Sequence, residues 1–451
     1  MSSQALILGA GVTGLAAGTA SGLPVFEATD VPGGICSSYY MRPGDSARLP
    51  VPPPDEEVYR LEIGGGHWIF GGDSAVLRFI QSLAPARRYT RSSAVYFPDG
   101  QRLVPYPIQN NLAALPSETR EQAVQEIVEL SQKKHSVATM ADWLRASLGE
   151  TLCGLFFFPF HDLYTAGLYT SIAAQDAYKS PIDLSLVIKG AFNEAPAAGY
   201  NVTFMYPEEG LNALAQRMAA QANVKYGKRV AGIDPDLRVV RFDDGSVVNY
   251  DLLLSTLPLN RMIGLTGLRV DSAADPATSV LVANIGAHRG DRCPDAHWLY
   301  IPRSEAGFHR VGFYSNVDRS FLPASHRERN DRVAIYVEKA YQDGKALSAA
   351  DSANTCRAIV RELQSWGFIG EVEVVDPTWI DVAYTWAWPG STWRGKALKM
   401  LDEHGILQVG RYGRWVFQGI ADSIRDGLVA GAAFRAGAGK RLRVTTSDAG
   451  A

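Results

Sequence analysis

The chain has 451 residues, 46% of them hydrophobic and 20% charged, and a formal net charge of −3 at pH 7. This composition is that of a globular protein and excludes extended disorder, while the length points to two or three compact parts. The weakly negative charge argues against a nucleic-acid partner, and no apolar run approaches the ~18 residues of a membrane helix. The four cysteines form no CxxC pair, so we expect no metal site. Because no membrane helix is expected and the chain enters a strand by Gln4 without an export signal, we expect no membrane partner and a cytoplasmic location.

The first 27 residues predict a βαβ unit that binds a dinucleotide. Residues 5–8 (ALIL) form an apolar run typical of a central parallel strand, and residues 9–14 (GAGVTG) lead from it into a helix rich in small residues. A second strand, residues 23–26, ends at Glu27. The combination of strand, glycine-rich turn, helix and strand-terminal acid is more specific than a GxGxxG pattern alone.

The glycines and the acid of this unit have separate expected roles. Gly9 suits a tight turn, Gly11 lets the backbone approach a pyrophosphate, and Gly14 lets helix and strand pack closely. The helix N-terminus offers N–H groups and a positive dipole end to the phosphates. Glu27 stands where an acid accepts a hydrogen bond from a ribose hydroxyl. The plainer alternative is a glycine-rich turn that holds no ligand.

Downstream, strands and helices follow in blocks. We expect a hairpin at residues 94–104 and a mostly helical region over residues 115–195. Later strands and a last helix are expected at residues 224–251, 252–258, 279–316, 332–338, 406–410 and 426–434.

These blocks predict an α/β fold with a discontinuous Rossmann-type FAD domain, an inserted helical domain and a mostly antiparallel sheet domain. Pieces of the dinucleotide fold from the start, the middle and the end of the chain would come together. The expected boundaries are 1–75, 200–262 and 402–440 for the FAD domain, 113–198 for the helical domain, and 86–112 with 263–400 for a sheet domain on the substrate side.

Three separated segments resemble FAD-dependent amine-oxidase-like flavoproteins, the superfamily that includes protoporphyrinogen oxidase. The segment after Glu27 continues to a second glycine pair at residues 33–34, as in their E-x-x-x-x-x-G-G pattern. Residues 229–233 (RVAGI) resemble the return strand whose valine packs on the adenine side, and residues 409–424 resemble the closing flavin-contact motif. The resemblance implies bound FAD, contacted by Gly9, Gly11, Gly14, Glu27, Gly33, Gly34, Val230, Gly410, Arg411, Ser423 and Ile424.

Within that superfamily the chain is most similar to UDP-galactopyranose mutases, particularly those of eukaryotic type. Residues 63–70 (IGGGHWIF) resemble their histidine loop, and residues 104–112 (VPYPIQNNL) resemble a PYPFQNN segment. Residues 297–302 (HWLYIP) and 308–316 (FHRVGFYSN) resemble a block whose tyrosine and arginine face the sugar-nucleotide diphosphate. Tyr384 stands at the place of another diphosphate-contacting tyrosine.

The resemblance implies a nucleotide-sugar mutase, an isomerase that interconverts pyranose and furanose forms. N5 of reduced FAD would be the nucleophile at the anomeric carbon, with NAD(P)H as a candidate reductant. His67 would lie beside the flavin, and Arg310 would hold the diphosphate by bidentate charge-assisted bonds. The substrate-binding residues that the resemblance implies are Tyr300, Tyr384, Asn316 and Asn110.

Two segments depart from the mutase pattern. Where the family reads F-R-F-P-x-R-G-G, residues 204–211 read FMYPEEGL, so both arginines are missing. Glu208 and Glu209 would repel a diphosphate if they faced it. After Gly413 the expected W-R-Y…N-x-D becomes WVFQGIAD at residues 415–422. Each lost charge-assisted bond costs ~1.5–3 kcal/mol, so we expect a substrate other than plain UDP-galactopyranose.

Three hypotheses follow. The first is a mutase acting on another nucleotide sugar, with its anion held by residues such as Lys179 or Arg303. The second is an FAD-dependent oxidoreductase of the amine oxidase, dehydrogenase or desaturase type, with an aromatic cage from residues 384–388 (YTWAW). The third is a flavin-binding protein whose pocket has decayed and which serves as a partner. His161 is interpreted as a structural residue.

Overall fold

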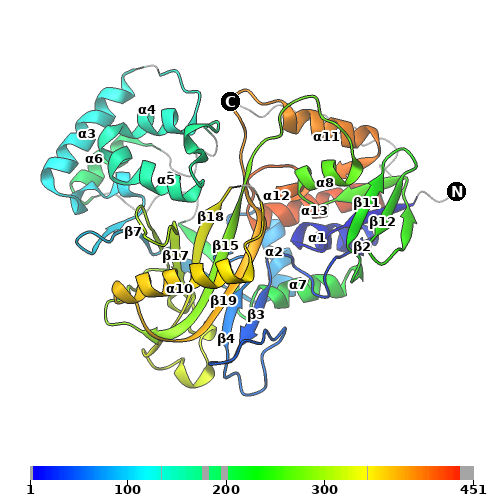
Figure 1. Cartoon of the computed structure of the whole chain (residues 1–451), viewed down its shortest axis with the longest axis horizontal. Coiled ribbons are helices and arrows are strands. Elements are labelled where there is room, and N and C mark those ends of the chain that lie inside the picture. Colours follow the sequence, from blue (N-terminus) through cyan, green and yellow to red (C-terminus); the bar gives the residue numbers. More distant parts are fainter. Residues whose placement is uncertain (1–3, 134, 175–181, 195–201, 343, 437–451) are drawn as a thin grey trace.

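A five-stranded parallel sheet forms the centre of the nucleotide-binding half (Figure 1). The computed structural model describes residues 4–133, 135–174, 182–194, 202–342 and 344–436. β1 is apolar throughout, β14 is apolar except for Ser255, and both are buried beyond their first residue, as central parallel strands should be. In sheet order the strands are β10 (Asn223–Lys225), β2 (Pro24–Phe26), β1 (Ala5–Leu8), β14 (Leu252–Ser255) and β20 (Ile406–Gln408).

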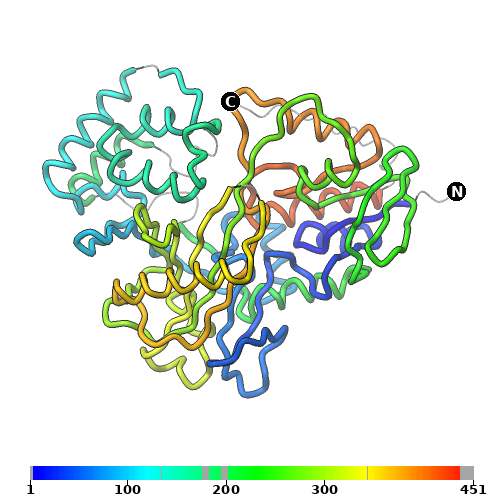
Figure 2. The backbone as a smooth tube through the Cα atoms, viewed as in Figure 1, coloured from blue at the N-terminus to red at the C-terminus, as the bar shows by residue number. Residues whose placement is uncertain are grey.

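Two helices from opposite ends of the chain pack against each other beside this sheet, α1 (Val12–Ser21) and α13 (Ile420–Arg435). A Cβ on Gly427 would stand 2.1 Å from the carbonyl oxygen of Thr13, and one on Gly431 would stand 2.4 Å from that of Ala17. Glycine is therefore required for this close approach, which fixes the C-terminal segment on the N-terminal βαβ unit. Figure 2 shows the blue, green and red parts of the chain brought together in this way.

A seven-stranded sheet forms the second part, and its pairs are antiparallel except for β16 with β7. The long strands β15 and β19 pair over most of their length, and α10 (Ala349–Ser365) packs on this sheet through an apolar face. In sheet order the strands are β19 (Ile369–Thr385), β15 (Ala277–Arg289), β18 (Arg332–Tyr341), β17 (Arg310–Phe313), β16 (Trp298–Tyr300), β7 (Ser93–Phe97) and β8 (Arg102–Pro105).

The third part is helical and lies at the upper left of Figure 1. A reciprocal capping box between Thr139 and Asp142 begins α4. Between α4 and α5, Cys153–Phe157 form a π-helical turn, a feature often found at functional sites. The helices are α3 (Ser117–Ser131), α4 (Met140–Leu152), α5 (Phe158–Tyr164) and α6 (Leu184–Ala191).

Shorter elements connect the three parts. Further strands form the pair β3 (Ser38–Met41) and β4 (Tyr59–Glu62), the sheet β5 (Ile69–Phe70), β9 (Thr203–Pro207) and β6 (Ala86–Thr90), and the meander β11 (Val230–Asp234), β12 (Val239–Phe242) and β13 (Val247–Asn249). Further helices are α2 (Ser74–Leu83), α7 (Leu211–Ala220), α8 (Leu259–Thr266), α9 (Tyr314–Val317), α11 (Trp393–Glu403) and α12 (Gly410–Gly413).

The predicted α/β fold class is confirmed by the parallel sheet, the largely antiparallel sheet and the helical part. All five strands of the parallel sheet fall within the segments expected for the FAD domain. Two elements differ from the prediction. β6 pairs with β9 rather than with the large sheet, and α13 begins at Ile420, earlier than the predicted 426. The reason for the second difference is that residues 420–424 pack into the core as helix, although they contain few large apolar side chains.

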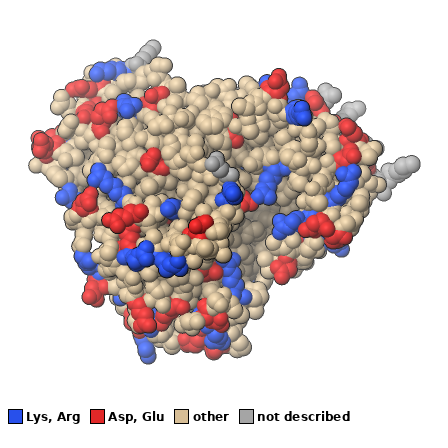
Figure 3. All heavy atoms as spheres, in the orientation of Figure 1, with Lys and Arg blue, Asp and Glu red and all other residues tan. Residues whose placement is uncertain are grey.

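The surface and the helices bear on the expected partners. On the face shown in Figure 3, acidic and basic side chains both occur across the surface. Within the described part of the chain, no helix is both long enough and apolar enough to cross a bilayer. In the same part, no group of three or more His, Cys, Asp or Glu side chains is arranged to hold a metal ion.

Candidate active site

A cavity of about 790 Å³ is lined by the nucleotide-binding part, the seven-stranded sheet and the helical part. Two helix N-termini, those of α1 and α13, contribute to its lining, and no side chain caps either of them. Uncapped N-termini present N–H groups and positive dipole ends to a ligand. The lining segments are residues 9–13, 33–36 and 63–71, parts of α5, β18 and β19, and residues 409–423.

The glycine loop has the geometry that its sequence predicts. Gly9 adopts a left-handed backbone with φ of +92°. A Cβ on Gly14 would stand 1.9 Å from the carbonyl oxygen of Gly9, so a larger residue cannot be accommodated there. A Cβ on Gly11 would meet no atom within 4 Å, and Gly11 lines the cavity. The space beside Gly11 is therefore available to a ligand rather than filled by protein.

Glu27 is held beside this loop by three donors. Its Oε2 accepts a hydrogen bond from the N–H of Ala10 at 2.8 Å, and its Oε1 accepts bonds from the N–H and hydroxyl of Thr29 at 3.0 and 2.9 Å. The side chain also lines the cavity. Because a carboxylate offers about four acceptor sites, acceptor capacity remains for a ribose hydroxyl.

The second glycine pair is fastened to the first loop. The N–H of Gly33 donates to the carbonyl of Ala10 at 2.8 Å, and Gly33 forms a parallel bridge with Gly11. Gly33 and Gly34 both have positive φ, +105° and +59°. A Cβ on Gly33 would stand 2.8 Å from the carbonyl oxygen of Cys36. The two glycine loops therefore form one side of the cavity together.

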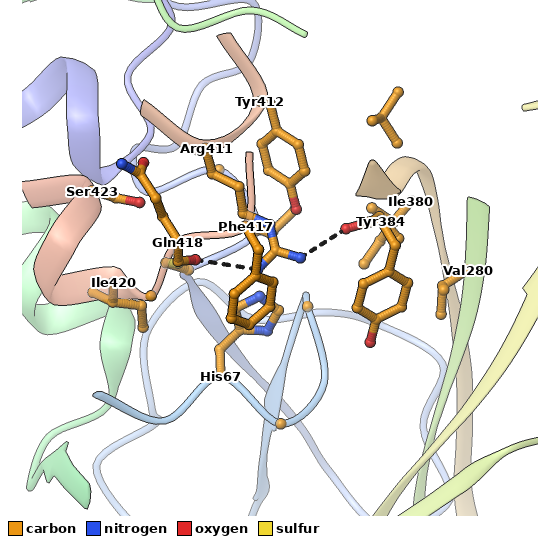
Figure 4. A pocket seen from close by; sticks show the side chains of 18 of the residues that line it. His67, Val280, Ile380, Tyr384, Arg411, Tyr412, Phe417, Gln418, Ile420 and Ser423 are labelled. Carbon is orange, nitrogen blue, oxygen red and sulfur yellow. Dashed lines mark hydrogen bonds between the residues drawn. The ribbon is translucent and has the colours of Figure 1, made fainter. Parts of the chain in front are cut away.

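Arg411 carries a fixed positive charge in the cavity wall (Figure 4). Its Nη1 donates to the carbonyl of Gln418 at 3.2 Å and its Nη2 to that of Ala383 at 3.1 Å. Its guanidinium carbon lies 4.7 Å from the ring centre of Phe417 and 5.8 Å from that of Tyr384. These contacts orient the side chain from both sides, which suits a residue that stabilises developing negative charge on a cofactor.

His67 stands on a loop that is packed tightly against Tyr336. A Cβ on Gly66 would stand 2.0 Å from the Tyr336 hydroxyl, and one on Gly64 would stand 2.5 Å from the His67 ring. Burial, reinforced by the nearby charge of Arg411, lowers the pKa of His67 to about 4. The imidazole is therefore neutral at pH 7 and faces the cavity as a hydrogen-bonding group without charge.

Glu338 is the centre of a charged cluster in the same cavity wall. Its Oε1 accepts a hydrogen bond from Nη2 of Arg310, and its Oε2 accepts one from the Tyr384 hydroxyl at 3.3 Å. Nε2 of His309 lies 3.5 Å from that Oε2. Burial opposes ionisation of Glu338, but Arg310 and His309 outweigh it and lower the pKa of Glu338 to about 2. The positive charge of Arg310 is therefore balanced by a buried carboxylate.

The helical part supplies an aromatic wall. The ring centre of Tyr164 lies 4.7 Å from that of Tyr384 and 5.3 Å from that of His309. Outside the helical part, the ring centres of Tyr106 and Tyr300 lie 4.4 Å apart. The charged cluster thus faces rings rather than other charges. The π-helical turn and α5 contribute Phe156, Phe157, Phe160, His161 and Tyr164 to the lining.

Most of the residues predicted for the site come together in this cavity. Gly14 lies directly behind it, against Gly9, where its predicted role in packing places it. The predicted residues that line the cavity are Gly9, Gly11, Glu27, Gly33, Gly34, His67, Tyr300, Arg310, Tyr384, Gly410, Arg411 and Ser423.

Besides Gly14, four predicted residues are not among those that line the cavity. The side-chain amide of Asn316 donates to two backbone carbonyls and accepts from Arg289, so it fastens a loop. Asn110 is buried against α6, Val230 lies in the β11 meander, and Ile424 is fully buried in the core. Asn316 and Asn110 therefore lie outside the cavity lining, and their role in substrate binding stays a prediction.

The two glutamates that replace family residues do not face the cavity. Glu208 forms an ion pair with Arg87 at 3.3 Å and Glu209 forms one with Arg217 at 2.7 Å, outside the cavity lining. The expected repulsion of a bound diphosphate therefore does not arise from these side chains, because each is turned toward a surface arginine.

The candidate substitutes for the missing arginines also lie elsewhere. Arg303 is exposed and pairs with Asp99 at 3.1 Å, and Lys179 lies outside the described residues. Within residues 384–388, Tyr384 lines the cavity, but the indoles of Trp386 and Trp388 are bonded to Thr278 and to the carbonyl of Ala274. The aromatic cage expected from this run is therefore wrong, and α5 supplies the rings instead.

Three cavity residues were missed by sequence reasoning or misinterpreted. Glu338 is the one acidic residue of β18, a strand that is mostly apolar. A buried acidic residue in such a strand was the feature of the sequence that could have identified it as a site residue. His309 immediately precedes Arg310 and carried no motif of its own. His161, interpreted as structural, does contact the carbonyl of Phe157 at 2.7 Å, but it also lines the cavity.

The residues present fit FAD. The uncapped N-terminus of α1 and the open space at Gly11 suit a pyrophosphate, and Glu27 suits a ribose. At the other cofactor-binding loop, Arg411 and the N-terminus of α13 offer positive charge to a flavin ring. His67 lies beside these groups and adds no charge of its own.

A match to a family model agrees with the conclusion that this cavity fits a flavin cofactor. The model of the flavin-containing amine oxidoreductases matches residues 15–417, which is most of the chain. The chain therefore belongs to that family and is a flavoenzyme. The lining residues outside the match lie at its two ends, within residues 9–13 and 418–423.

Solved structures show the same fold over nearly the whole chain. A structure of reduced UDP-galactopyranose mutase matches with a TM-score of 0.79 at 21% identity, covering 96% of this chain and 95% of that one. Putrescine oxidase bound to putrescine matches with 0.57 at 17% identity, covering 96% and 99%. A CLA-producing fatty acid isomerase from P. acnes matches with 0.54 at 14% identity, covering 95% and 97%. At these identities the comparisons show the fold alone.

Proposed function

We propose that this chain is an FAD-dependent mutase that interconverts pyranose and furanose forms of a nucleotide sugar other than plain UDP-galactopyranose. The observation that carries the proposal is that His67 and the glycine loops line the same cavity as Arg310 and two tyrosines. Cofactor-binding groups and groups suited to a sugar diphosphate therefore share one space. The similarity in fold to the mutase structure over the whole chain supports this choice.

The protein's own residues would bind and orient the substrate. Arg310 offers a planar donor fork for a diphosphate, and the hydroxyl of Tyr300 offers a neutral donor. The hydroxyl of Tyr384 would have to leave Glu338 to donate to the same group. His67, neutral at pH 7, can donate or accept a hydrogen bond without adding charge. When bound, reduced FAD supplies a nucleophile for the anomeric carbon and oxidised FAD supplies a hydride acceptor.

One observation favours a second candidate, an FAD-dependent oxidoreductase that acts on a small amine. The carboxylate of Glu338 lines the cavity and accepts a hydrogen bond from Tyr384, whose ring packs against that of Tyr164. A carboxylate among aromatic rings suits a protonated amine, by charge pairing and by cation–π attraction. This candidate needs Glu338 to exchange its bond with Arg310 for one with the substrate.

The two candidates require different oxidation states of the cofactor. The FAD-loaded protein is incubated, oxidised or reduced with dithionite, with a panel of nucleotide sugars, and the products are separated by chromatography. We expect furanose products from the reduced protein alone. If no nucleotide sugar is converted, while an added amine bleaches the oxidised flavin under anaerobic conditions, the mutase proposal is wrong and the second candidate holds.

Arg310 provides the test at the level of a residue. Arg310→Met should raise KM for the nucleotide sugar by about tenfold or more, because it removes a charge-assisted bond. Arg303→Met is the matched control, since Arg303 is also an ion-paired arginine but lies outside the cavity. Equal KM values for the two variants would remove Arg310 from substrate binding.

A further inference from the structure

His309 is a buried imidazole with a single polar neighbour within ion-pair distance among the described residues. The residue is 1% exposed, its Nε2 lies 3.5 Å from Oε2 of Glu338 without the geometry of a hydrogen bond, and its Nδ1 has no hydrogen-bond partner among those residues. Its position is fixed by the backbone, since its N–H donates to the carbonyl of Glu338 at 3.0 Å and its carbonyl accepts from Ile301 at 2.9 Å. The ring borders the cavity next to Arg310. A buried polar ring whose hydrogen bonds are not satisfied calls for a functional explanation.

The groups that face His309 come from four elements. Glu338 on β18 lies 3.5 Å away, Arg310 follows on β17, and Tyr384 on β19 and Tyr164 on α5 pack against the ring. One positive and one negative charge cancel, and the tyrosines are neutral. Burial lowers the pKa of His309, and Glu338 only partly opposes this. Without a ligand, His309 is therefore neutral at pH 7 and the cluster has no net charge.

We propose that His309 takes up a proton from solvent when the diphosphate of a nucleotide sugar binds beside Arg310, and so supplies the second positive charge of the site. This inference rests on the proposed function, because it requires an anionic substrate. Bound next to the Arg310–Glu338 pair, a diphosphate would leave more negative than positive charge in a buried space. A proton on His309, already placed against Glu338, restores the balance.

His309 is better suited to this role than the other cavity histidines. Nδ1 of His161 already contacts the carbonyl of Phe157 at 2.7 Å. His67 lies near Arg411, whose charge opposes a proton there. His309, unlike His67, lies within 4 Å of a carboxylate among the described residues. It would thus replace the charge of one of the two arginines missing from residues 204–211.

The test measures protons directly. UDP is titrated into the oxidised FAD-loaded protein by calorimetry in two buffers of different ionisation enthalpy, near pH 7. We expect the wild type to take up as much as one more proton per UDP than His309→Gln. After correction for the protonation of free UDP, the wild-type affinity should fall with rising pH by at most about tenfold per unit. His309→Gln should bind more weakly, with a flatter pH profile.

A matched control and a second variant secure the interpretation. His288 also lies beside carboxylates, 3.6 Å from Glu373, but outside the cavity, so His288→Gln should take up protons as the wild type does. If His309→Gln does not hold FAD, His309→Asn replaces it. If neither variant holds FAD, the wild-type profile decides, because an affinity independent of pH overturns the inference.

Failure of the inference about His309 can be distinguished from failure of the proposed function. If UDP binds to the wild type and to His309→Gln with equal proton uptake, the inference is wrong and the proposed function stands. If neither UDP nor other nucleoside diphosphates bind to the FAD-loaded wild type at millimolar concentration, the anionic substrate is wrong, and both proposals fall together.

Discussion

Replacing Gly14 by alanine tests how the glycine loop holds the cofactor. The added Cβ would stand 1.9 Å from the carbonyl oxygen of Gly9, whereas real Cβ contacts stay beyond 3.0 Å, so the loop and α1 must separate by about 1.1 Å. Overpacking of this kind costs about 1–3 kcal/mol. Because the displaced loop is also the pyrophosphate-binding segment, we expect the Kd for FAD to rise about 5- to 150-fold.

Gly11→Ala provides the contrast. Its Cβ would meet no protein atom within 4 Å, but it would project into the space expected for the pyrophosphate. The flavin-free Gly11→Ala protein should therefore unfold at the wild-type temperature and yet bind FAD poorly, whereas flavin-free Gly14→Ala should also lose stability. Gly395→Ala in α11 is the control, because its Cβ is unobstructed and lies away from the cavity.

The measurements are FAD titration of flavin-free protein, followed by fluorescence, and thermal unfolding of the same samples. The reasoning is refuted if Gly14→Ala binds FAD with wild-type affinity. It is also refuted if Gly11→Ala destabilises the flavin-free protein as much as Gly14→Ala does, since only the second substitution creates a clash within the protein.

Three further predictions concern stability, each measured by urea unfolding. Glu338→Gln should destabilise by about 3 kcal/mol, because it leaves the charge of Arg310 without its buried partner, and adding Arg310→Met should recover part of the loss. Burial raises the pKa of Glu62 from 4.5 to about 7, so the native state keeps a proton that the unfolded state loses. Stability should then fall as pH rises through that window, and a slope that persists in Glu62→Gln would contradict this assignment. Asp73→Ala should cost about 1 kcal/mol, because Asp73 accepts two N–H bonds at the start of α2; an unchanged midpoint would deny it that role.

Local sequence was sufficient for the cofactor-binding loops. Gly9 has the positive φ, Gly11 the open space and Gly14 the close contact with the carbonyl oxygen of Gly9 that the motif predicts. The same holds for Gly33 and Gly34, which need positive φ. Such features are predictable because a short stretch of chain determines its own steric limits.

The substrate-facing part was predictable only in part. The residues Arg310, Tyr300 and Tyr384 were identified from sequence blocks and do line the cavity, but Asn316 and Asn110 from the same kind of block do not, and the amide of Asn316 is bonded to backbone carbonyls. Similarity between a block of this sequence and a family segment indicates that the backbone has the same local fold in both. It does not show which side chains of the block turn toward the ligand.

By itself, the sequence determined the nucleotide-binding unit, the class of fold and the presence of His67 in the cavity wall. Tertiary structure alone revealed that Glu338 neutralises Arg310, that His309 lies buried beside them, and that α5 supplies the aromatic wall. The physical reason is that charge balance and burial depend on side chains from β17, β18, β19 and α5 meeting in space. Those elements are far apart in the chain, and no local pattern encodes their contact.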